Sequence, residues 1–119
     1  VRPRRRRERG MATAELALAL PSLVLVLAVA LAAVDLGLAQ VRCVDAARLG
    51  ARLVARAEPH AVVLDEVRRA APSGAQVVVA TTGAHGTVTV TGRAPAVLRF
   101  LGVVDPPRAT AVATLESAP

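Results

Sequence analysis

The sequence predicts an α+β protein. A single N-terminal transmembrane helix is expected to continue into an amphipathic helix, which packs on a small antiparallel sheet. Three observations predict this fold. An uncharged apolar run extends from Leu16 to Val34, and arginines then recur on one side of a helix up to Arg56. Further along, two segments rich in β-branched residues surround a glycine-containing turn at residues 83–86.

The apolar run has the length of a membrane span. Its about nineteen residues measure roughly 28 Å as a helix, close to the thickness of a hydrocarbon core. A buried helix of a small soluble domain would show a polar stripe at helical period. This run shows none, since Leu, Val and Ala lie on every side and only Pro21 and Ser22 interrupt it. We therefore expect a transmembrane helix over residues 11–35.

The positive charge of the chain is concentrated before this helix. The net charge is +6, and the six arginines before Gly10, set against Glu8, account for all but one unit of it. Val1 to Arg9 is too short and too self-repelling to fold, so residues 1–10 are predicted to form a basic cytoplasmic leader. By the positive-inside rule, the N-terminus then stays in the cytoplasm and the C-terminal domain lies outside. Without Tyr or Trp to stack on bases, no nucleic-acid partner is expected.

Residues 36–119 are predicted to form a small extracytoplasmic α+β domain. Its first part continues the helix, with charged residues on one side and small residues on the other, so that a sheet can approach closely. The charged side consists of Arg42, Asp45, Arg48, Arg52 and Arg56, and the other of Cys43, Val44, Ala47, Gly50, Ala51 and Val54.

The remaining elements follow from local patterns. Pro59 and His60 end the long helix, and a short second helix precedes Pro72. Strands are predicted at Gln76 to Thr82 and Thr87 to Thr91, because both are rich in β-branched residues and flank a turn, and at Arg108 to Glu116, where two sets of residues alternate. Arg93 to Gly102 is ambiguous, with a helical turn as one interpretation, and Val103 to Pro107 is a loop.

The chain offers little to an enzyme. Its only histidines are His60 and His85, and its only cysteine, Cys43, is far from both in sequence. No zinc-ligand spacing, phosphate-binding glycine loop or nucleophile elbow is present, so neither catalysis, a metal nor a cofactor is expected. Cys43 cannot form an internal disulfide; it is either a small buried residue or a partner for another chain.

Glu15 is an acid at the entrance of the apolar run. A carboxylate costs about 2.5 to 3.5 kcal/mol at the centre of a membrane helix and less near the interface. In the first turn of a helix, the exposed amides and the dipole favour it by up to about 1 kcal/mol. Glu15 is therefore either an ordinary helix-start residue or a functional acid.

The order of these features resembles a known signal. An arginine-rich leader, Gly10, small residues at 12–14, Glu15 and the run ending at Pro21 look like the class III signal of type IV pilins and pseudopilins. They are most similar to the TadE-like minor pilins of Flp (tight adherence) pilus systems. The segment at residues 41–48 also looks like the one that follows the span in actinobacterial TadE-like proteins.

The resemblance implies specific roles for these residues. In that family a prepilin peptidase cuts after the glycine, so Gly10 and Met11 would flank the cut and Glu15 would serve in assembly. Pro21 would kink the helix and let it bend on leaving the membrane, although a neutral proline is also tolerated there. Cutting before the apolar region retains the helix, and the new amine at Met11 needs an anion, which Glu15 of a neighbouring subunit can supply.

Two functions remain open at this point. The resemblance implies a structural minor pilin or pseudopilin whose partners are the membrane, prepilin peptidase and other pilin subunits. It would reside in the inner or cell membrane, or in a surface pilus. The alternative is a bitopic protein with an uncleaved signal anchor and a small external binding domain. Met11 is also a candidate translation start, in which case there is no leader to cut.

Overall fold

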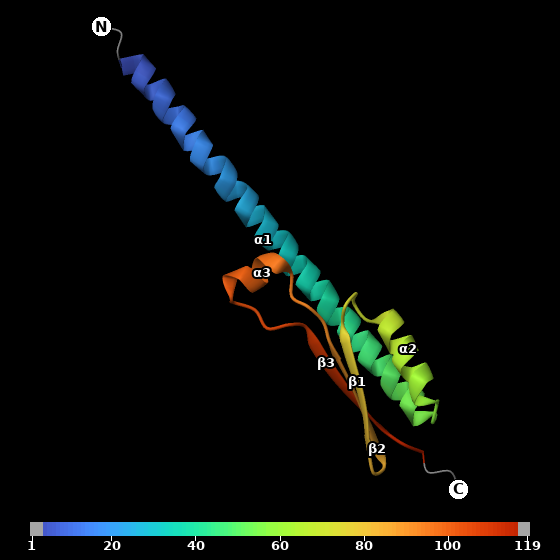
Figure 1. The fold of residues 1–119 in the computed structure, drawn as a ribbon. Helices are drawn as coiled ribbons and strands as arrows, with labels where there is room; N and C mark the ends of the chain where they lie inside the picture. Colours follow the sequence, from blue (N-terminus) through green and yellow to red (C-terminus); the bar gives the residue numbers. More distant parts are fainter. Residues whose placement is uncertain (1–3, 117–119) are drawn as a thin grey trace.

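One helix, α1 (Arg4–Ala55), extends through most of the length of the molecule in the computed structural model, which describes residues 4–116. Its 52 residues correspond to about 78 Å, and the molecule measures 98 × 21 × 15 Å. The N-terminal half of α1 projects alone, and most of the other elements gather along its C-terminal half (Figure 1).

The leader is helical from Arg4 onward, so the prediction of an unfolded segment up to Arg9 is wrong for the described residues. Residues 1–3 lie outside them. Arginine has a high helix propensity, and repulsion between like charges one turn apart costs only a few tenths of a kcal/mol. The apolar run has already paid the nucleation cost, so the helix extends backward into the leader.

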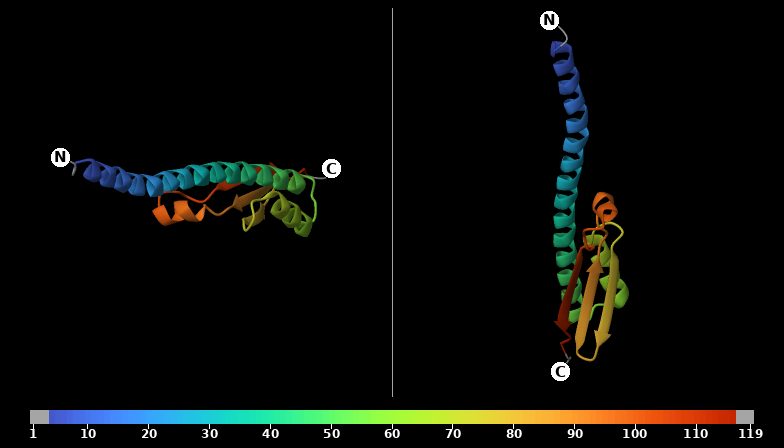
Figure 2. Two further views of the ribbon diagram at one scale, coloured as in Figure 1. Left: turned by 90° about the horizontal axis from the view of Figure 1, so that it is seen from above. Right: turned by 90° about the vertical axis from the view of Figure 1, so that its left-hand side faces the viewer.

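The C-terminal half of α1 is combined with two helices and a sheet. The other elements are α2 (His60–Ala70), β1 (Gln76–Thr82), β2 (His85–Thr91), α3 (Ala96–Leu101) and β3 (Arg108–Thr114). The strands are antiparallel in the order β1-β2-β3. α1 packs on β2 and β3 while α2 packs on β1, which leaves the other face of the sheet open (Figure 2). The predicted α+β class is confirmed.

The β1–β2 hairpin has a shorter loop than the sequence predicts. Pairing continues to Thr82 opposite His85, so only Gly83 and Ala84 form the loop. Gly83 has a φ of 60°, and Ala84 is not among the residues with positive φ. This is the pattern of a type II′ turn, in which the first central residue needs the left-handed region and is usually glycine.

The predicted alternation along the strands is confirmed. Val88 and Val90 of β2 are fully buried, whereas the threonines of β2 are on the opposite face. In β3 the alanines are half-buried and the threonines exposed, although the strand ends at Thr114, before the predicted Glu116. The ambiguous segment forms α3, which buries Leu98 and ends at Gly102 with a φ of 65°.

The core joins α1, α2 and β2. Its buried residues are Cys43, Ala46, Ala47, Val54, Val63, Val67, Val88 and Val90. Small residues on α1 allow this close approach. A Cβ added at Gly50 would lie 2.7 Å from Val67 Cγ2 and 2.8 Å from Val88 Cγ1. The predicted small-residue face is therefore the face that contacts the sheet, with Ala46 as a further member.

Candidate functional site

The apolar part of α1 has almost no protein around it. Apart from the half-buried Val29, its large side chains are between 57% and 76% exposed: Met11, Leu16, Leu18, Leu20, Leu23, Val24, Leu25, Val26, Leu27, Leu31 and Val34. The most apolar window has a mean hydropathy of 2.7. A core helix of a soluble protein can be equally apolar but is mostly buried, whereas only 6% of this window is buried. The described residues thus contain one helix long and apolar enough to cross a membrane.

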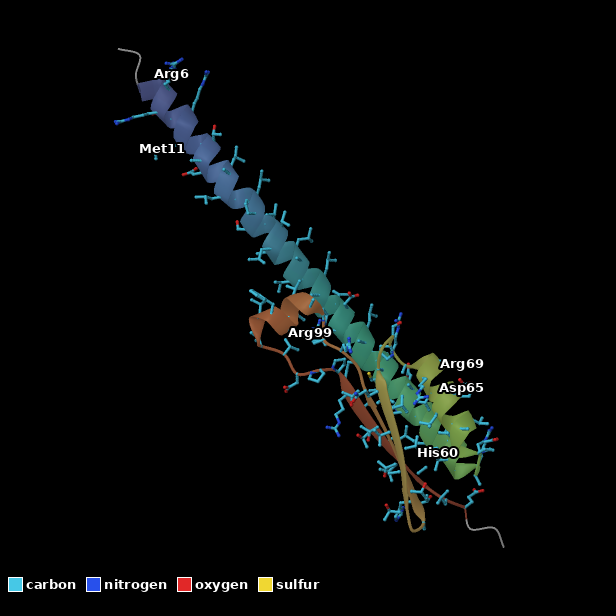
Figure 3. All side chains as sticks on the ribbon, viewed as in Figure 1. Arg6, Met11, His60, Asp65, Arg69 and Arg99 are labelled. Atoms are coloured by element: carbon cyan, nitrogen blue, oxygen red, sulfur yellow. The ribbon has the colours of Figure 1, made fainter. Side chains whose placement is uncertain are left out.

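The predicted cleavage bond between Gly10 and Met11 lies inside α1, near its N-terminal end (Figure 3). Both residues are exposed, and nothing lies within 4 Å of a Cβ added at Gly10. Thr13 Oγ1 donates a hydrogen bond of 2.8 Å to the Arg9 carbonyl and so bridges the bond. Cleavage at this bond would require local unwinding, which glycine favours by about 0.5 to 1 kcal/mol relative to alanine.

Glu15 does not occupy the first turn of the helix. Because α1 begins at Arg4, Glu15 lies about three turns inside it, and the first turn contains no acidic residue. The interpretation as an ordinary helix-start residue therefore fails for the uncut chain. Glu15 is exposed and lies one turn after Met11, on the same side of the helix. A chain that began at Met11 would place this acid near a helix N-terminus.

Pro21 lies within α1 without ending it. The helix is gently curved in the blue region that contains residue 21, rather than broken there (Figure 2). Ser22 Oγ donates a hydrogen bond of 2.8 Å to the Ala19 carbonyl, whereas the carbonyl that Pro21 leaves without its helical donor is that of Ala17. Bending at Pro21 on leaving the membrane stays a prediction.

A polar junction that the sequence did not reveal attaches α1 to the start of β3. The Gln40 side chain donates from Nε2 to the Arg108 carbonyl at 2.9 Å and accepts from the Arg108 amide at Oε1 at 3.0 Å. It thereby pairs with β3 as a neighbouring strand would. The only available signal was that Gln40 is the single amide side chain in α1.

Cys43 lies one turn further along, inside the same junction. It is 0% exposed, and its Sγ lies 3.9 Å from the Pro107 carbonyl, which also accepts a 2.8 Å hydrogen bond from the Gly92 amide. Burial raises the pKa of the Cys43 thiol, and a backbone hydrogen bond from Gly92 partly opposes this. Cys43 is thus a small buried residue here, which leaves its thiol inaccessible to another chain.

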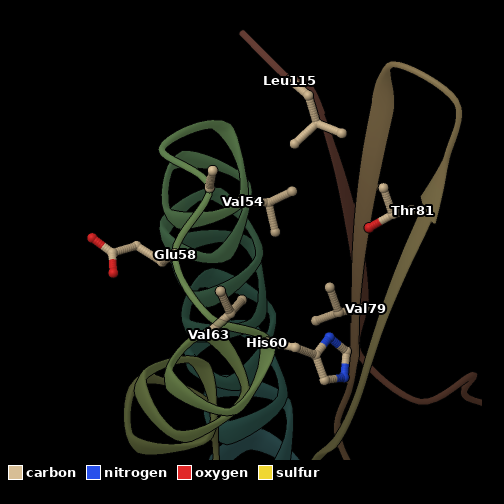
Figure 4. Close-up of a pocket in the computed structure, with 8 residues that line it drawn as sticks. Val54, Glu58, His60, Val63, Val79, Thr81 and Leu115 are labelled. Carbon is tan, nitrogen blue, oxygen red and sulfur yellow. The ribbon is translucent and has the colours of Figure 1, made fainter. Parts of the chain in front are cut away.

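A small pocket of about 110 Å³ lies between the end of α1 and β1 (Figure 4). His60 points toward Val79 across it, whereas Glu58 points away, so these two titratable groups do not converge. The remaining lining is largely apolar. Within residues 4–116 no three His, Cys, Asp or Glu side chains are grouped so as to hold a metal ion.

The features above define a class of protein. It is an α+β protein with one long helix, of which one half is apolar, exposed and of membrane-spanning length, while the other half is part of a three-stranded domain. No protein-family model, curated protein or solved structure matches the chain.

Proposed function

We propose that this chain is a structural minor pilin or pseudopilin of the TadE-like type. In this proposal prepilin peptidase cuts it after Gly10, and α1 then assembles with other pilin subunits in a Flp/Tad-type pilus or secretion apparatus. One observation carries the proposal. Glu15 is the only acid between the leader and Asp35, and it lies in an exposed apolar helix one turn after the Gly10–Met11 bond.

The cut gives this acid a partner. A carboxylate that stays unpaired next to the hydrocarbon core is unfavourable, and so is the new ammonium group at Met11. In a low-dielectric environment a pair of opposite charges interacts much more strongly than in water, while an unpaired charge is strongly destabilising. Pairing Glu15 of one subunit with the Met11 amine of the next satisfies both groups and sets the register between helices.

The surface of α1 supports packing against other helices. Its exposed half has no polar stripe, and alanines between the large side chains allow helix backbones to approach closely. The sheet and α2 surround only the C-terminal half, so most of the apolar half is free to join a bundle (Figure 1). In this proposal the arginine-rich leader stays in the cytoplasm and the domain lies outside, as the positive-inside rule predicts.

The first experiment tests the cut. We expect co-expression with the prepilin peptidase of a Flp/Tad system to produce a chain whose N-terminus is Met11, as measured by mass spectrometry. Gly10→Phe should block the cut. Gly37→Phe is the matched control, because Gly37 is also an open glycine in α1, and it should be cut normally. An intact leader beside an active peptidase would exclude the pilin proposal.

The second experiment tests the acid. Glu15→Ala should leave membrane insertion and cleavage unchanged but abolish incorporation into the pilus, measured in sheared surface fractions. Glu8→Ala removes an acid from the discarded leader and should have no effect. Normal incorporation of Glu15→Ala would remove the assembly role from Glu15.

A second candidate is a bitopic protein with an uncleaved anchor and an external binding domain. The observation in its favour is that α1 is continuous across the Gly10–Met11 bond. This candidate predicts that the leader remains and that Gly10→Phe changes nothing, so the first experiment separates the two.

A further inference from the structure

α3 lies beside the membrane-spanning part of α1 rather than beside the sheet (Figure 1). At this level α1 is covered on one side only, because Ala32 is 8% exposed and Ala28 and Val29 are half-buried while their neighbours are exposed. All three residues belong to the apolar run. Therefore α3, which belongs to the external domain, lies at the same level along the α1 axis as the end of the predicted span.

α3 ends in an apolar tip, which we define as Phe100, Leu101 and Val103. Phe100 is the only aromatic residue of the chain and is 91% exposed, and Val103 is 77% and Leu101 48% exposed. Leu98 is the residue of α3 that turns inward, with 6% exposure. All three side chains of the tip are apolar, and those of Phe100 and Val103 are mostly in contact with solvent rather than protein.

The depth of the tip follows from helix geometry. Ala32 lies two residues before Val34, the last residue of the run, and Ala28 lies six before it. At the helical rise these positions are about 3 Å and 9 Å inside the end of the run. Interfacial elements bury their apolar side chains about 5 to 10 Å into the boundary between headgroups and acyl chains. If the run fills the hydrocarbon core, the α1 residues buried beside α3 lie at or near this depth, and we expect the tip beside them.

Arginines lie on α3 and around the end of the run. Arg99 is exposed on α3, and an open hollow of about 340 Å³ just beyond the run contains Arg42 and Arg93 together with Asp35. Arginines at the end of a span extend their charged groups toward lipid phosphates while their aliphatic parts remain in apolar surroundings. The apolar tip would thus match the acyl chains of a lipid monolayer, and the arginines would match its headgroup phosphates.

We propose that the apolar tip of α3 is a second membrane contact, inserted into the outer leaflet beside α1 with Arg93 and Arg99 against lipid phosphates. The continuity of the tip with the exposed apolar surface of α1 identifies the occupant as lipid. This inference rests on the membrane span in the proposed function. The contact fixes the tilt of the domain on the bilayer and must be released when a subunit leaves the membrane.

The absence of Trp and Tyr from the chain makes a direct test available. Three single-tryptophan variants of the full chain are reconstituted into vesicles of phosphatidylcholine and phosphatidylglycerol. Brominated phosphatidylcholines then quench tryptophan according to depth. Phe100→Trp reports the tip, and Leu25→Trp reports the middle of the span. Val112→Trp is the control, because Val112 is 64% exposed but lies on the open face of the sheet.

The expected pattern has three parts. Bromines near the headgroup end of the acyl chain should quench Phe100→Trp more strongly than bromines near the chain end, because an interfacial side chain lies only about 5 to 10 Å deep. Bromines near the chain end should quench Leu25→Trp, and Val112→Trp should be unaffected by either lipid. Quenching of Leu25→Trp with Phe100→Trp as bright as the control would overturn this inference while leaving the span in place.

Two other results would also overturn it. A blue-shifted but unquenched Phe100→Trp would mean that the tip is covered by another protein copy instead of lipid. If Leu25→Trp is not quenched, the span itself fails, and both the proposed function and this inference fail with it.

Discussion

Replacing Gly50 by alanine is expected to loosen the contact between α1 and its domain. The added Cβ would lie 2.7 Å from Val67 Cγ2 and 2.8 Å from Val88 Cγ1, closer than the 3.0 Å that real Cβ contacts respect. Both valines are fully buried, one on α2 and the other on β2. Because β-branched side chains have few rotamers to choose from, the helix or both neighbours must move.

A matched control isolates the magnitude of this effect. Gly37→Ala makes the same chemical change in the same helix, with nothing within 4 Å of the new Cβ. Alanine gains helix propensity at both positions, so the difference between the variants is the overpacking, about 1 to 3 kcal/mol. This difference corresponds to a change of about 5- to 150-fold in the equilibrium for opening the interface.

Cys43 supplies the assay, since it is the only thiol and must be uncovered before it reacts. In detergent micelles, a thiol reagent should label Cys43 faster in Gly50→Ala than in Gly37→Ala, by the factor given above. Labelling must be slower than reclosing, which a linear dependence of the rate on reagent concentration verifies. Equal labelling rates in the two variants would refute the packing argument.

Two further predictions concern the junction between α1 and β3. Gln40→Leu removes both side-chain bonds to the Arg108 backbone, which should cost about 1 kcal/mol and speed deuterium exchange at the Arg108 amide. The Leu115 amide, bonded to Ala84, serves as the unaffected control, and unchanged exchange at Arg108 would contradict the role of Gln40. The second prediction concerns pH. Because burial raises the pKa of Cys43, the folded chain keeps the thiol proton at a pH where the unfolded chain loses it. The contribution of Cys43 to the free energy of unfolding should therefore be fully present below the ordinary thiol pKa of about 8.5. It should be lost as the pH rises through the pKa of Cys43 in the folded chain. The chain has no Lys or Tyr to titrate in this range, so Cys43→Ala should flatten the dependence of the urea midpoint on pH; an equal decline in that variant would exclude the thiol as its source.

The sequence by itself determined the features that adjacent residues encode. The membrane-length run, the small-residue face of the helix around Gly50 and the alternation in β2 and β3 are all periodic patterns. Each pattern matches the geometry of one helix or one strand, so it can be recognised without knowing what packs against it. The order Gly10, Met11, Glu15 is equally local, and its role in assembly remains a proposal.

Local sequence patterns did not predict where the helices and strands begin and end. The helix begins at Arg4 because an existing helix is extended at little cost, a cooperative effect that the charge of the leader obscured. Likewise, the hairpin loop is reduced to two residues because pairing with β1 carries β2 back to His85. In both cases the neighbouring structure outweighed the preference of the segment itself.

Only the tertiary structure decided which distant residues meet. Gln40 bonds to Arg108 across 68 residues of sequence, and α3 lies beside α1, whose apolar run buries Ala32. Such contacts depend on how the sheet is positioned along α1, and this position results from the packing of the whole core. The segment that the sequence left ambiguous forms α3 with the exposed Phe100. It is a candidate membrane contact only because the tertiary structure positions it beside the end of the span.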